Sequence, residues 1–297
     1  MLPKVYKIMF WFSISLVVLS FIAVAVFGLR LGVDFKGGSI LDLNFQHRPA
    51  ITDVQQALAG KYPDLGITPE ASSGLLIRSD FLTEEQHQQL LSSIRSSFPN
   101  AGMSENQFSS VGPVIGSQLE HNSIIAIFVV LFAVIIYIAF VFRKLGRTTS
   151  PWAMGLAAIV ALIHDITIPF GVFAVLGHYF GIEISGVFVA AALTILGFSV
   201  SDTVVIFDRV RENILRHGAK EGFGQVVHKS VLQTLTRSLN TVFTVLLSLF
   251  AIYFFGGESI KYFALALIIG IFLGAYSSIF VASPLLVWWT GKKGQQR

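Results

Sequence analysis

Six long apolar stretches make up most of this chain and limit the folds that it can adopt. They cover residues Ile8–Phe27, Ile124–Phe142, Trp152–Leu176, Gly186–Phe207, Val231–Phe255 and Tyr262–Trp289. A helix needs about 20 mostly apolar residues to cross the hydrocarbon core of a bilayer, and each stretch is near or above that length. Charged residues make up 13% of the chain, against roughly 25% in soluble domains. The sequence therefore predicts a polytopic α-helical membrane protein with six transmembrane helices.

Basic residues in the short loops predict the orientation of the helices, because such residues favour the cytoplasmic side. Those that we assign to that side are Lys4, Lys7, Arg143, Lys144, Arg147, Arg209, Arg211, Arg216, Lys220, Lys229, Lys292, Lys293 and Arg297. The opposite loops, residues 177–185 and 256–261, contain one Lys or Arg between them, Lys261. Both termini are therefore expected in the cytoplasm, and residues 29–123 on the outer side.

The expected organisation has four parts. They are residues 1–28 (tail and first helix), 29–123 (outer α+β domain), 124–291 (five-helix domain) and 292–297 (cytoplasmic tail). The sequence Ala23-Val-Ala25 also allows a signal peptide with a cleavage site, but the apolar stretch before it is too long for a typical signal peptide. We expect a retained anchor helix.

Residues 29–123 are rich in Ser, Gln, Asp and Glu and predict a small domain with its own core. The expected elements are strands at Ser39–Phe45, Leu65–Pro69, Gly74–Arg78 and Ser104–Val111, and helices at Thr52–Ala59 and Thr83–Phe98. Thr52 and Thr83 are expected to be N-caps. This order of strands and helices is that of a ferredoxin-like fold.

Two glycine-rich joints flank this domain, residues 32–38 and 111–116. Glycine adopts backbone conformations that other residues avoid, so these joints form either anchoring turns or hinges. The joint residues of interest are Asp34, Gly37, Gly38, Gly112 and Gly116.

Asp202 lies inside the fourth apolar stretch, where a carboxylate is costly and indicates a functional site. Arg237 lies in the fifth stretch, and by helix rise both residues are about 10 Å inside the cytoplasmic boundary. Matching depth on consecutive antiparallel helices makes contact between them feasible. The sequence therefore predicts either proton or ion handling at Asp202 or a structural salt bridge with Arg237.

The fifth stretch carries further polar residues at spacings of three and four, so they share one helix face. They are Gln233, Arg237, Asn240, Thr241, Thr244 and Ser248. This stripe is expected to face protein or water. The third stretch adds His164 and Asp165, which suit either a proton relay or polar contacts between helices.

The composition argues against several kinds of site. The chain has no cysteine, which excludes disulfides and Cys-based metal sites. His47, His87 and His121 are scattered along the outer domain, so neither a metal nor a cofactor is expected. The basic residues lie in membrane-flanking loops, where they suit lipid rather than nucleic acid.

Three motifs together resemble the SecD/SecF family of the bacterial Sec protein translocase. They are Asp34-Phe-Lys-Gly-Gly38, the segment Gly197–Asn213 with Asp202 at its centre, and Phe255-Gly-Gly. The resemblance covers essentially the whole chain and implies the resistance-nodulation-division membrane fold. Asp202 then matches the family's proton-path Asp, and Arg237 the Arg expected to pair with it.

The resemblance also implies a function and partners. It implies use of the proton motive force to complete export of unfolded precursor proteins after the SecA ATPase has acted. The expected partners are a homologous SecD subunit, which would supply a second set of six helices, and the SecYEG channel, with YajC and YidC as further candidates. The expected location is the bacterial inner membrane.

Three alternatives remain open from the residues alone. A proton-coupled exporter of small molecules would need a larger outer domain with an apolar cleft. An intramembrane aspartyl protease would use Asp165 and Asp202 as a dyad; it is disfavoured by the sequence Ser199-Val-Ser-Asp202 and by an expected depth difference of roughly 10 Å. A structural scaffold would tolerate neutralisation of Asp202.

Overall fold

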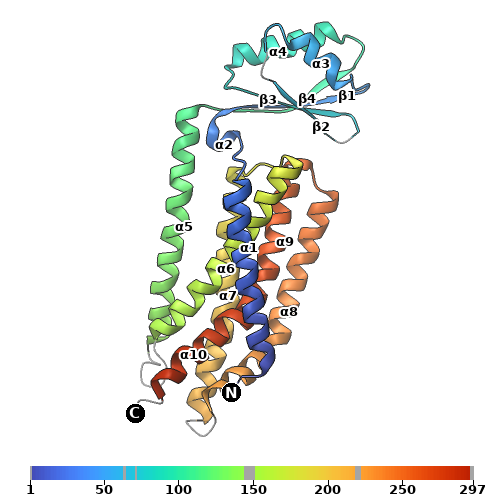
Figure 1. The fold of residues 1–297 in the computed structure, drawn as a ribbon. Coiled ribbons are helices and arrows are strands. Elements are labelled where there is room, and N and C mark those ends of the chain that lie inside the picture. Colours follow the sequence, from blue (N-terminus) through green and yellow to red (C-terminus); the bar gives the residue numbers. More distant parts are fainter. Residues whose placement is uncertain (1, 63–64, 71, 144–150, 218–221, 295–297) are drawn as a thin grey trace. The chain divides into compact units, whose positions relative to one another are not determined.

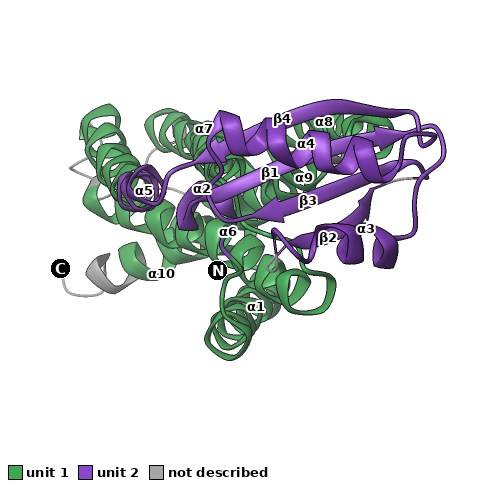
Figure 2. Ribbon diagram, turned by 90° about the horizontal axis from the view of Figure 1, so that it is seen from above, with its two compact units in different colours: residues 1–30, 124–297 green, residues 31–123 purple. Residues whose placement is uncertain are grey.

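The computed structural model describes residues 2–62, 65–70, 72–143, 151–217 and 222–294. The chain forms two compact units, which Figure 2 distinguishes by colour. We call residues 1–30 with 124–297 the membrane unit, and residues 31–123 the outer unit. Four of the charges used to predict orientation, Lys144, Arg147, Lys220 and Arg297, lie outside the described residues, as do residues 295–297 of the expected tail.

The described residues contain six helices that are long and apolar enough to cross a membrane. They are α1 (Lys4–Phe27), α5 (Pro113–Val141), α6 (Pro151–Phe180), α7 (Gly186–His217), α8 (Phe223–Phe255) and α9 (Glu258–Ser277), the last continuing through a π-helical turn, η3 (Ser278–Ala282), into α10 (Ser283–Gly294). Figure 1 shows them as long coiled ribbons. The predicted six-helix fold class is confirmed.

Helices α6, α7 and α9 form the centre of the membrane unit. In the apolar parts of these helices 56%, 44% and 61% of residues are buried, against 11% in α1, 6% in α5 and 17% in α8. Phe142, Phe173 and Phe207 are among the largest fully buried side chains. The outer faces of α1, α5 and α8 are therefore open to lipid or to another protein.

Glycines allow the central helices to approach closely. A Cβ atom on Gly171 of α6 would lie 2.4 Å from Cβ of Ser20 in α1, and one on Gly270 of α9 would lie 2.1 Å from Ile195 of α7. A Cβ atom on Gly274, one turn further along α9, would lie 3.1 Å from Ser199. Small residues at such crossings let helix backbones meet, as the spacing of Gly270 and Gly274 predicts.

The outer unit contains a four-stranded antiparallel sheet with two helices on one face (Figure 1). Its elements are α2 (Val33–Lys36), β1 (Gly38–Phe45), α3 (Ile51–Leu58), β2 (Gly66–Glu70), β3 (Gly74–Ser79), α4 (Glu84–Ser97) and β4 (Met103–Val111). The strand order is β2-β3-β1-β4, the ferredoxin-like order. Alternate residues of β1 and β3 point into the core, where Leu43 and Leu75 meet Leu90 and Ile94 of α4.

One of the two N-caps predicted in the outer unit is confirmed, and the other is wrong. Thr83 caps α4 in a reciprocal capping box with Gln86, as predicted. The prediction for Thr52 is wrong, because α3 begins at Ile51 after an extended Ala50. Thr52 lies in the first turn, where its hydroxyl donates to Asp53.

The two glycine-rich joints meet in a crowded contact within the outer unit. A short helix that the sequence did not predict, α2, contains Asp34 and ends at Gly37, which has a φ of 80°. A Cβ atom on Gly37 would lie 2.8 Å from Cα of Pro113, and one on Gly116 would lie 2.7 Å from the carbonyl oxygen of Phe35. This packing favours an anchoring turn over a loose hinge at α2 and the start of α5. Gly112, by contrast, has only the Phe81 ring nearby, at 4.0 Å.

Candidate functional site

Asp202 lies on α7 with its carboxylate directed toward α8 and η3. Its Oδ1 accepts a hydrogen bond from the hydroxyl of Ser238 on α8. Its Oδ2 is buried, with no hydrogen-bond partner among the described residues. The carboxylate is therefore only partly solvated by the protein, which is costly for an anion.

Arg237 does not form the expected contact with Asp202. Within the described residues no ion pair of 4.0 Å or less joins them, and Arg237 is exposed on the surface of α8. Consecutive residues on a helix point about 100° apart. Because Ser238 faces Asp202, the neighbouring Arg237 is directed to one side of that contact, although its charge is still close enough to interact with that of Asp202. A direct salt bridge within this chain is therefore absent from this structure.

The polar stripe of α8 lies on the outside of this chain. Arg237, Asn240, Thr241, Thr244 and Ser248 are all exposed, while Val231, Thr234, Ser238, Val242 and Leu249 form the buried face. The hydroxyls of Thr241 and Thr244 donate to the carbonyl oxygens of Arg237 and Asn240, four residues earlier. These threonines therefore satisfy their own donors within α8 and make no hydrogen bond to Asp202.

Gln233, at one end of the predicted stripe, has a separate role. It is exposed, and its Oε1 accepts a 2.9 Å hydrogen bond from Asn213 of α7, which also donates to Ser230 at 2.8 Å. These contacts join α7 to α8 near the ends of both helices.

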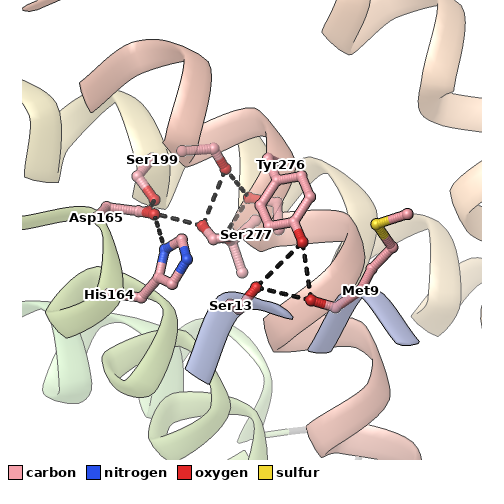
Figure 3. A network of polar contacts seen from close by, with 10 residues as sticks. Met9, Ser13, His164, Asp165, Ser199, Tyr276 and Ser277 are labelled. Carbon is pink, nitrogen blue, oxygen red and sulfur yellow. Dashed lines mark hydrogen bonds and ion pairs between the residues drawn. The ribbon is translucent and has the colours of Figure 1, made fainter. Parts of the chain in front are cut away.

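His164 and Asp165 form a second polar cluster, buried between α6, α7 and α9 (Figure 3). Asp165 Oδ1 lies 2.9 Å from His164 Nδ1. Its Oδ2 accepts hydrogen bonds from Ser199 of α7 at 2.5 Å and from Ser277 of α9 at 2.7 Å. Asp165 is fully buried and His164 is 3% exposed.

The buried cluster continues on the α1 side through Tyr276, whose ring stacks on His164 (Figure 3). Tyr276 donates to the carbonyl oxygen of Met9 at 2.8 Å, and Ser13 donates to the Tyr276 hydroxyl at 3.2 Å. One polar network therefore links α1, α6, α7 and α9.

The predicted set of site residues omits the hydroxyl side chains that contact the two carboxylates. They are Ser199 and Ser277, which donate to Asp165, and Ser238, which donates to Asp202. Thr203 and Ser278, each next in sequence to one of the site residues, bond to each other. Their spacing was a usable signal, because Ser199, Asp202 and Thr203 stand at intervals that share one helix face. Gly274, Ser277 and Ser278 repeat the same spacing on the opposing helix.

The two carboxylates are closer in depth than the sequence suggested. Asp165 contacts Ser199, which is three residues, or about 4.5 Å of helix rise, from Asp202. The expected separation of roughly 10 Å is therefore too large, and depth no longer argues against a dyad. Their hydrogen bonds go to different hydroxyls, Ser199 and Ser277 for Asp165 and Ser238 for Asp202, rather than to each other.

The described residues contain no group of three or more His, Cys, Asp or Glu side chains that could hold a metal ion. The site instead consists of two carboxylates, one imidazole and a set of hydroxyls. Such groups can bind, hold and transfer protons.

Family models match most of the chain. Residues 92–292 match the model for protein export membrane protein SecD/SecF, C-terminal, and residues 22–47 match the SecD/SecF GG motif. The chain belongs to the SecD/SecF family. The GG-motif match includes Gly37 and Gly38, and the larger match includes both carboxylates of the site.

Within the family, the chain is similar to proteins named protein translocase subunit SecF. It is 42% identical to the one from Thermobaculum terrenum over 94% of this chain and 90% of that relative. It is 38% identical to the one from Anaerolinea thermophila over 94% of this chain and 91% of that relative.

The fold is also similar to solved structures of SecDF. A crystal structure of SecDF from Thermus thermophilus, described as a translocon-associated membrane protein, matches 96% of this chain with 32% identity and a TM-score of 0.81. A second SecDF structure, in a form called super-membrane-facing, gives a TM-score of 0.68. The chain spans 38% of the first solved SecDF chain and 39% of the second.

Proposed function

We propose that this chain is the SecF-type half of a SecD/SecF pair, which uses the proton motive force to promote protein export through the SecYEG channel. The similarity to SecF translocase subunits over nearly the whole chain supports the export role. The similarity to less than half of a SecDF chain supports a SecD-type partner as the other half. YajC and YidC are further candidate partners, and unfolded precursors are the proposed cargo.

The proposed location is the bacterial inner membrane, with both termini in the cytoplasm and the outer unit on the opposite side. The six membrane-spanning helices and the distribution of basic residues support this orientation. An accessory role without enzymatic activity accords with the family.

The single observation that carries the proton-coupling proposal is the half-satisfied carboxylate of Asp202. One oxygen accepts a hydrogen bond from the hydroxyl of Ser238, and the other is buried without a partner among the described residues. Protonation removes the charge that this environment stabilises poorly. Asp202 is therefore suited to alternate between charged and neutral forms.

Arg237 enters this mechanism as a group of the interface with the partner. An exposed arginine and a polar stripe in the bilayer are costly unless protein or water covers them. A SecD-type partner on this face of α8 would enclose Arg237 and supply the acidic group that its charge requires. The proposed site is therefore completed by two polypeptides, with Asp202 on the buried side of α8 and Arg237 on the open side.

A protonation switch follows from this arrangement. In its charged form Asp202 holds Ser238, and so α8, against α7. In its neutral form the carboxyl group holds Ser238 less strongly, because hydrogen bonds to an ionised acceptor are about twice as strong as neutral ones. The change in α8 would alter the interface that Arg237 and the stripe form with the partner.

The test is export of a precursor in cells depleted of their own copy, with this chain or its Asp202→Asn variant present at equal membrane abundance together with the cognate SecD partner. We expect the wild type to restore proton-dependent export and Asp202→Asn to lose it. Asp208→Asn is the matched control, because Asp208 is an exposed carboxylate on the same helix that pairs with Arg211. Full activity of Asp202→Asn would favour the scaffold alternative.

A further inference from the structure

Helices α1 and α6 run parallel, and their C-terminal ends lie side by side. Ser20 of α1 lies against Gly171 of α6. Seven residues further along each helix, the ring centroids of Phe27 and His178 are 4.7 Å apart. Both helices are long and apolar enough to span a membrane. Their ends therefore leave the apolar layer at the same level, where the headgroups of the lipids lie.

An open hollow of about 250 Å³ lies between these two helix ends. Tyr179 and Phe180, at the end of α6, are 65% and 74% exposed. An exposed tyrosine at the end of a membrane helix is typical of the boundary between membrane and water. The residues that line the hollow are Phe27, Gly28, Leu29, Arg30, Gly177 and His178.

Arg30 is the charged side chain of this hollow, and its surroundings hold it in place. Its carbonyl oxygen accepts a 2.7 Å hydrogen bond from the amide of Ile184. A Cβ atom on Gly177 would lie 3.3 Å from Cβ of Arg30, and one on Gly181 would lie 3.5 Å from its Nη1. Glycine at both positions therefore leaves room for the arginine. Because the guanidinium is a planar fork of oriented donors, little freedom is lost when it binds a phosphate.

The guanidinium of Arg30 keeps donors available for a ligand. Its ionic partner among the described residues is Glu183, whose Oε1 lies 3.6 Å from Nε. This contact does not involve the two Nη groups, and 56% of the Arg30 side chain is exposed. Exposed ion pairs contribute little to stability, whereas an arginine can hold a phosphate through two parallel hydrogen bonds. Arg30 is therefore placed to bind a phosphate group.

Two further polar groups complete the site. His178 is exposed, and even a neutral imidazole donates a hydrogen bond through one ring nitrogen. Glu183 lies beside the guanidinium, and a carboxylate with about four acceptor positions can take donors from more than one group. With His178 neutral, Arg30 and Glu183 together have no net charge. This pair suits a ligand with adjoining positive and negative charges better than it suits an anion.

We propose that this hollow binds the headgroup of one phosphatidylethanolamine molecule. The phosphate accepts hydrogen bonds from the Nη groups of Arg30 and from the ring of His178, and the ammonium group donates to Glu183. The acyl chains extend along α1, where Ile22 and Val26 are exposed. Phosphatidylcholine has no N–H group for Glu183, and the extra negative charge of phosphatidylglycerol is left without a partner. This inference is independent of the proton-coupling proposal.

The experiment counts the lipids that stay bound to the whole chain, purified in detergent, by native mass spectrometry during titration with mixed micelles. The probes are phosphatidylethanolamine, phosphatidylcholine and phosphatidylglycerol with identical acyl chains, and inorganic phosphate as a competitor. We expect one phosphatidylethanolamine per chain. The other two lipids should bind about 10-fold more weakly, the scale of one lost hydrogen bond to a charged group.

Arg30→Gln should weaken the binding of phosphatidylethanolamine by about 10–100-fold, because the phosphate loses its charged donors. Arg216→Gln is the matched control, since Arg216 is also an exposed arginine that pairs with a glutamate, Glu212, but lies near the C-terminal end of α7. His178→Phe keeps a ring against Phe27 and should weaken binding by a smaller factor.

Glu183→Gln gives the sharpest test, because it leaves the site with a net positive charge. It should weaken the binding of phosphatidylethanolamine and strengthen that of phosphatidylglycerol, so that the order of the two lipids is reversed. A role of Glu183 in the fold alone would lower the binding of both lipids together and would overturn the inference.

Two other results would overturn this inference. One is unchanged binding of phosphatidylethanolamine to Arg30→Gln, and the other is displacement of the lipid by inorganic phosphate, which would assign the site to a free anion. Thermal denaturation midpoints in lipid-free detergent identify a variant that fails to fold. If Arg30→Gln fails to fold, Glu183→Gln and His178→Phe carry the test.

Discussion

Polar residues have different surroundings in two parts of the membrane unit: the buried side, between α6, α7 and α9, and the open side, which is the exposed face of α8. Between α6, α7 and α9, the Asp165 carboxylate has three donors, all from this chain. On the open side of α8, Arg237 is exposed, and Thr241 and Thr244 bond only to their own helix backbone. The Asp165 carboxylate is therefore fully hydrogen-bonded within one polypeptide, whereas the open side has polar groups that nothing in the described chain covers.

This difference indicates how a two-chain proton site can be divided. Groups that must keep a fixed geometry are placed where glycines bring helices into contact. The groups that we propose to respond to the partner lie on α8, a helix with few buried residues. Substitutions between α6, α7 and α9 should therefore lower the stability of the fold. Substitutions on the exposed face of α8 should instead lower proton-dependent export.

The largest expected effect comes from the open side. Arg237→Gln should reduce proton-dependent export by roughly 100-fold, comparable with loss of a proton-transfer group, because it removes the charge that we propose to face the partner. The thermal midpoint of the isolated chain should stay unchanged, since exposed substitutions alter stability by only about 0.5 kcal/mol. Export and thermal denaturation are measured on the same preparation.

Arg211→Gln is the control for Arg237→Gln, because Arg211 lies on α7 and already pairs with Asp208 at 3.1 Å. It should leave export close to wild type. A fall in the thermal midpoint of the Arg237→Gln chain would mean that Arg237 supports the fold itself, and the contrast between the two sides would then be lost.

The next effect tests the buried side. Gly171→Ala places a methyl group 2.4 Å from Cβ and 2.6 Å from Cα of Ser20, so α1 and α6 must separate. We expect a loss of about 1–3 kcal/mol, typical of overpacking, measured by denaturation in detergent. Gly197→Ala is the matched control because nothing lies within 4 Å of its added methyl group. Equal stability of the two variants would show that the glycine crossing is not under steric constraint.

A smaller effect is expected from the threonines of the stripe. Thr241→Leu combined with Thr244→Leu should weaken co-purification with the partner by roughly 5–10-fold, since interhelical hydrogen bonds in membranes contribute about 0.6 kcal/mol each. Within this chain these hydroxyls bond only locally, so its thermal midpoint should hardly change. Undiminished recovery of the partner would argue that another face of α8, or another helix, forms the interface.

The smallest effect concerns the outer unit, where water makes exposed polar groups inexpensive. Hydrogen bonds from Gln88 and then His87 lower the pKa of the exposed Glu84 carboxyl. Because the folded pKa lies below the unfolded one, the stabilisation is present above the unfolded pKa and is lost as pH falls through the folded pKa.

Glu84→Gln should therefore speed amide exchange in α4 slightly at neutral pH, and this difference should disappear in acid. Glu85→Gln, one residue further on, is the control. A difference that persists at low pH would mean that Glu84 stabilises α4 by something other than its charge.

Much of this fold could be predicted from the sequence, because hydrophobic length is a direct physical signal. Six apolar stretches gave six helices, and alternating apolar residues gave the strands of the outer unit. The rotation of α8 about its axis could not be predicted, because this helix carries polar residues on two faces. Ser238 and Arg237 are neighbours in sequence, and only the packing of α7 and α9 decides which of them meets Asp202.

The hydroxyls around the carboxylates were missed for a related reason. Serine and threonine are common in membrane helices, where most bond to their own backbone, as Ser20 does to Leu16. A serine becomes part of a site only when a second helix brings an acceptor to it. The pairing of Ser277 with Asp165 joins residues 112 positions apart, which a pattern within one helix cannot reveal.

The π-helical turn Ser278–Ala282 gives the last long helix a shift in phase. A turn that is one residue wider than an α-turn rotates everything after it by about 100° relative to a continuous α-helix. Before the turn, this helix presents Gly270 and Gly274 to α7; after it, Trp288 meets Phe10 of α1. One extra residue in the turn thus lets a single helix pack against both α7 and α1, which lie in different directions. Deleting one residue from the π-helical turn would make the helix a continuous α-helix. Either the contact with α7 or the contact between Trp288 and Phe10 would then be lost.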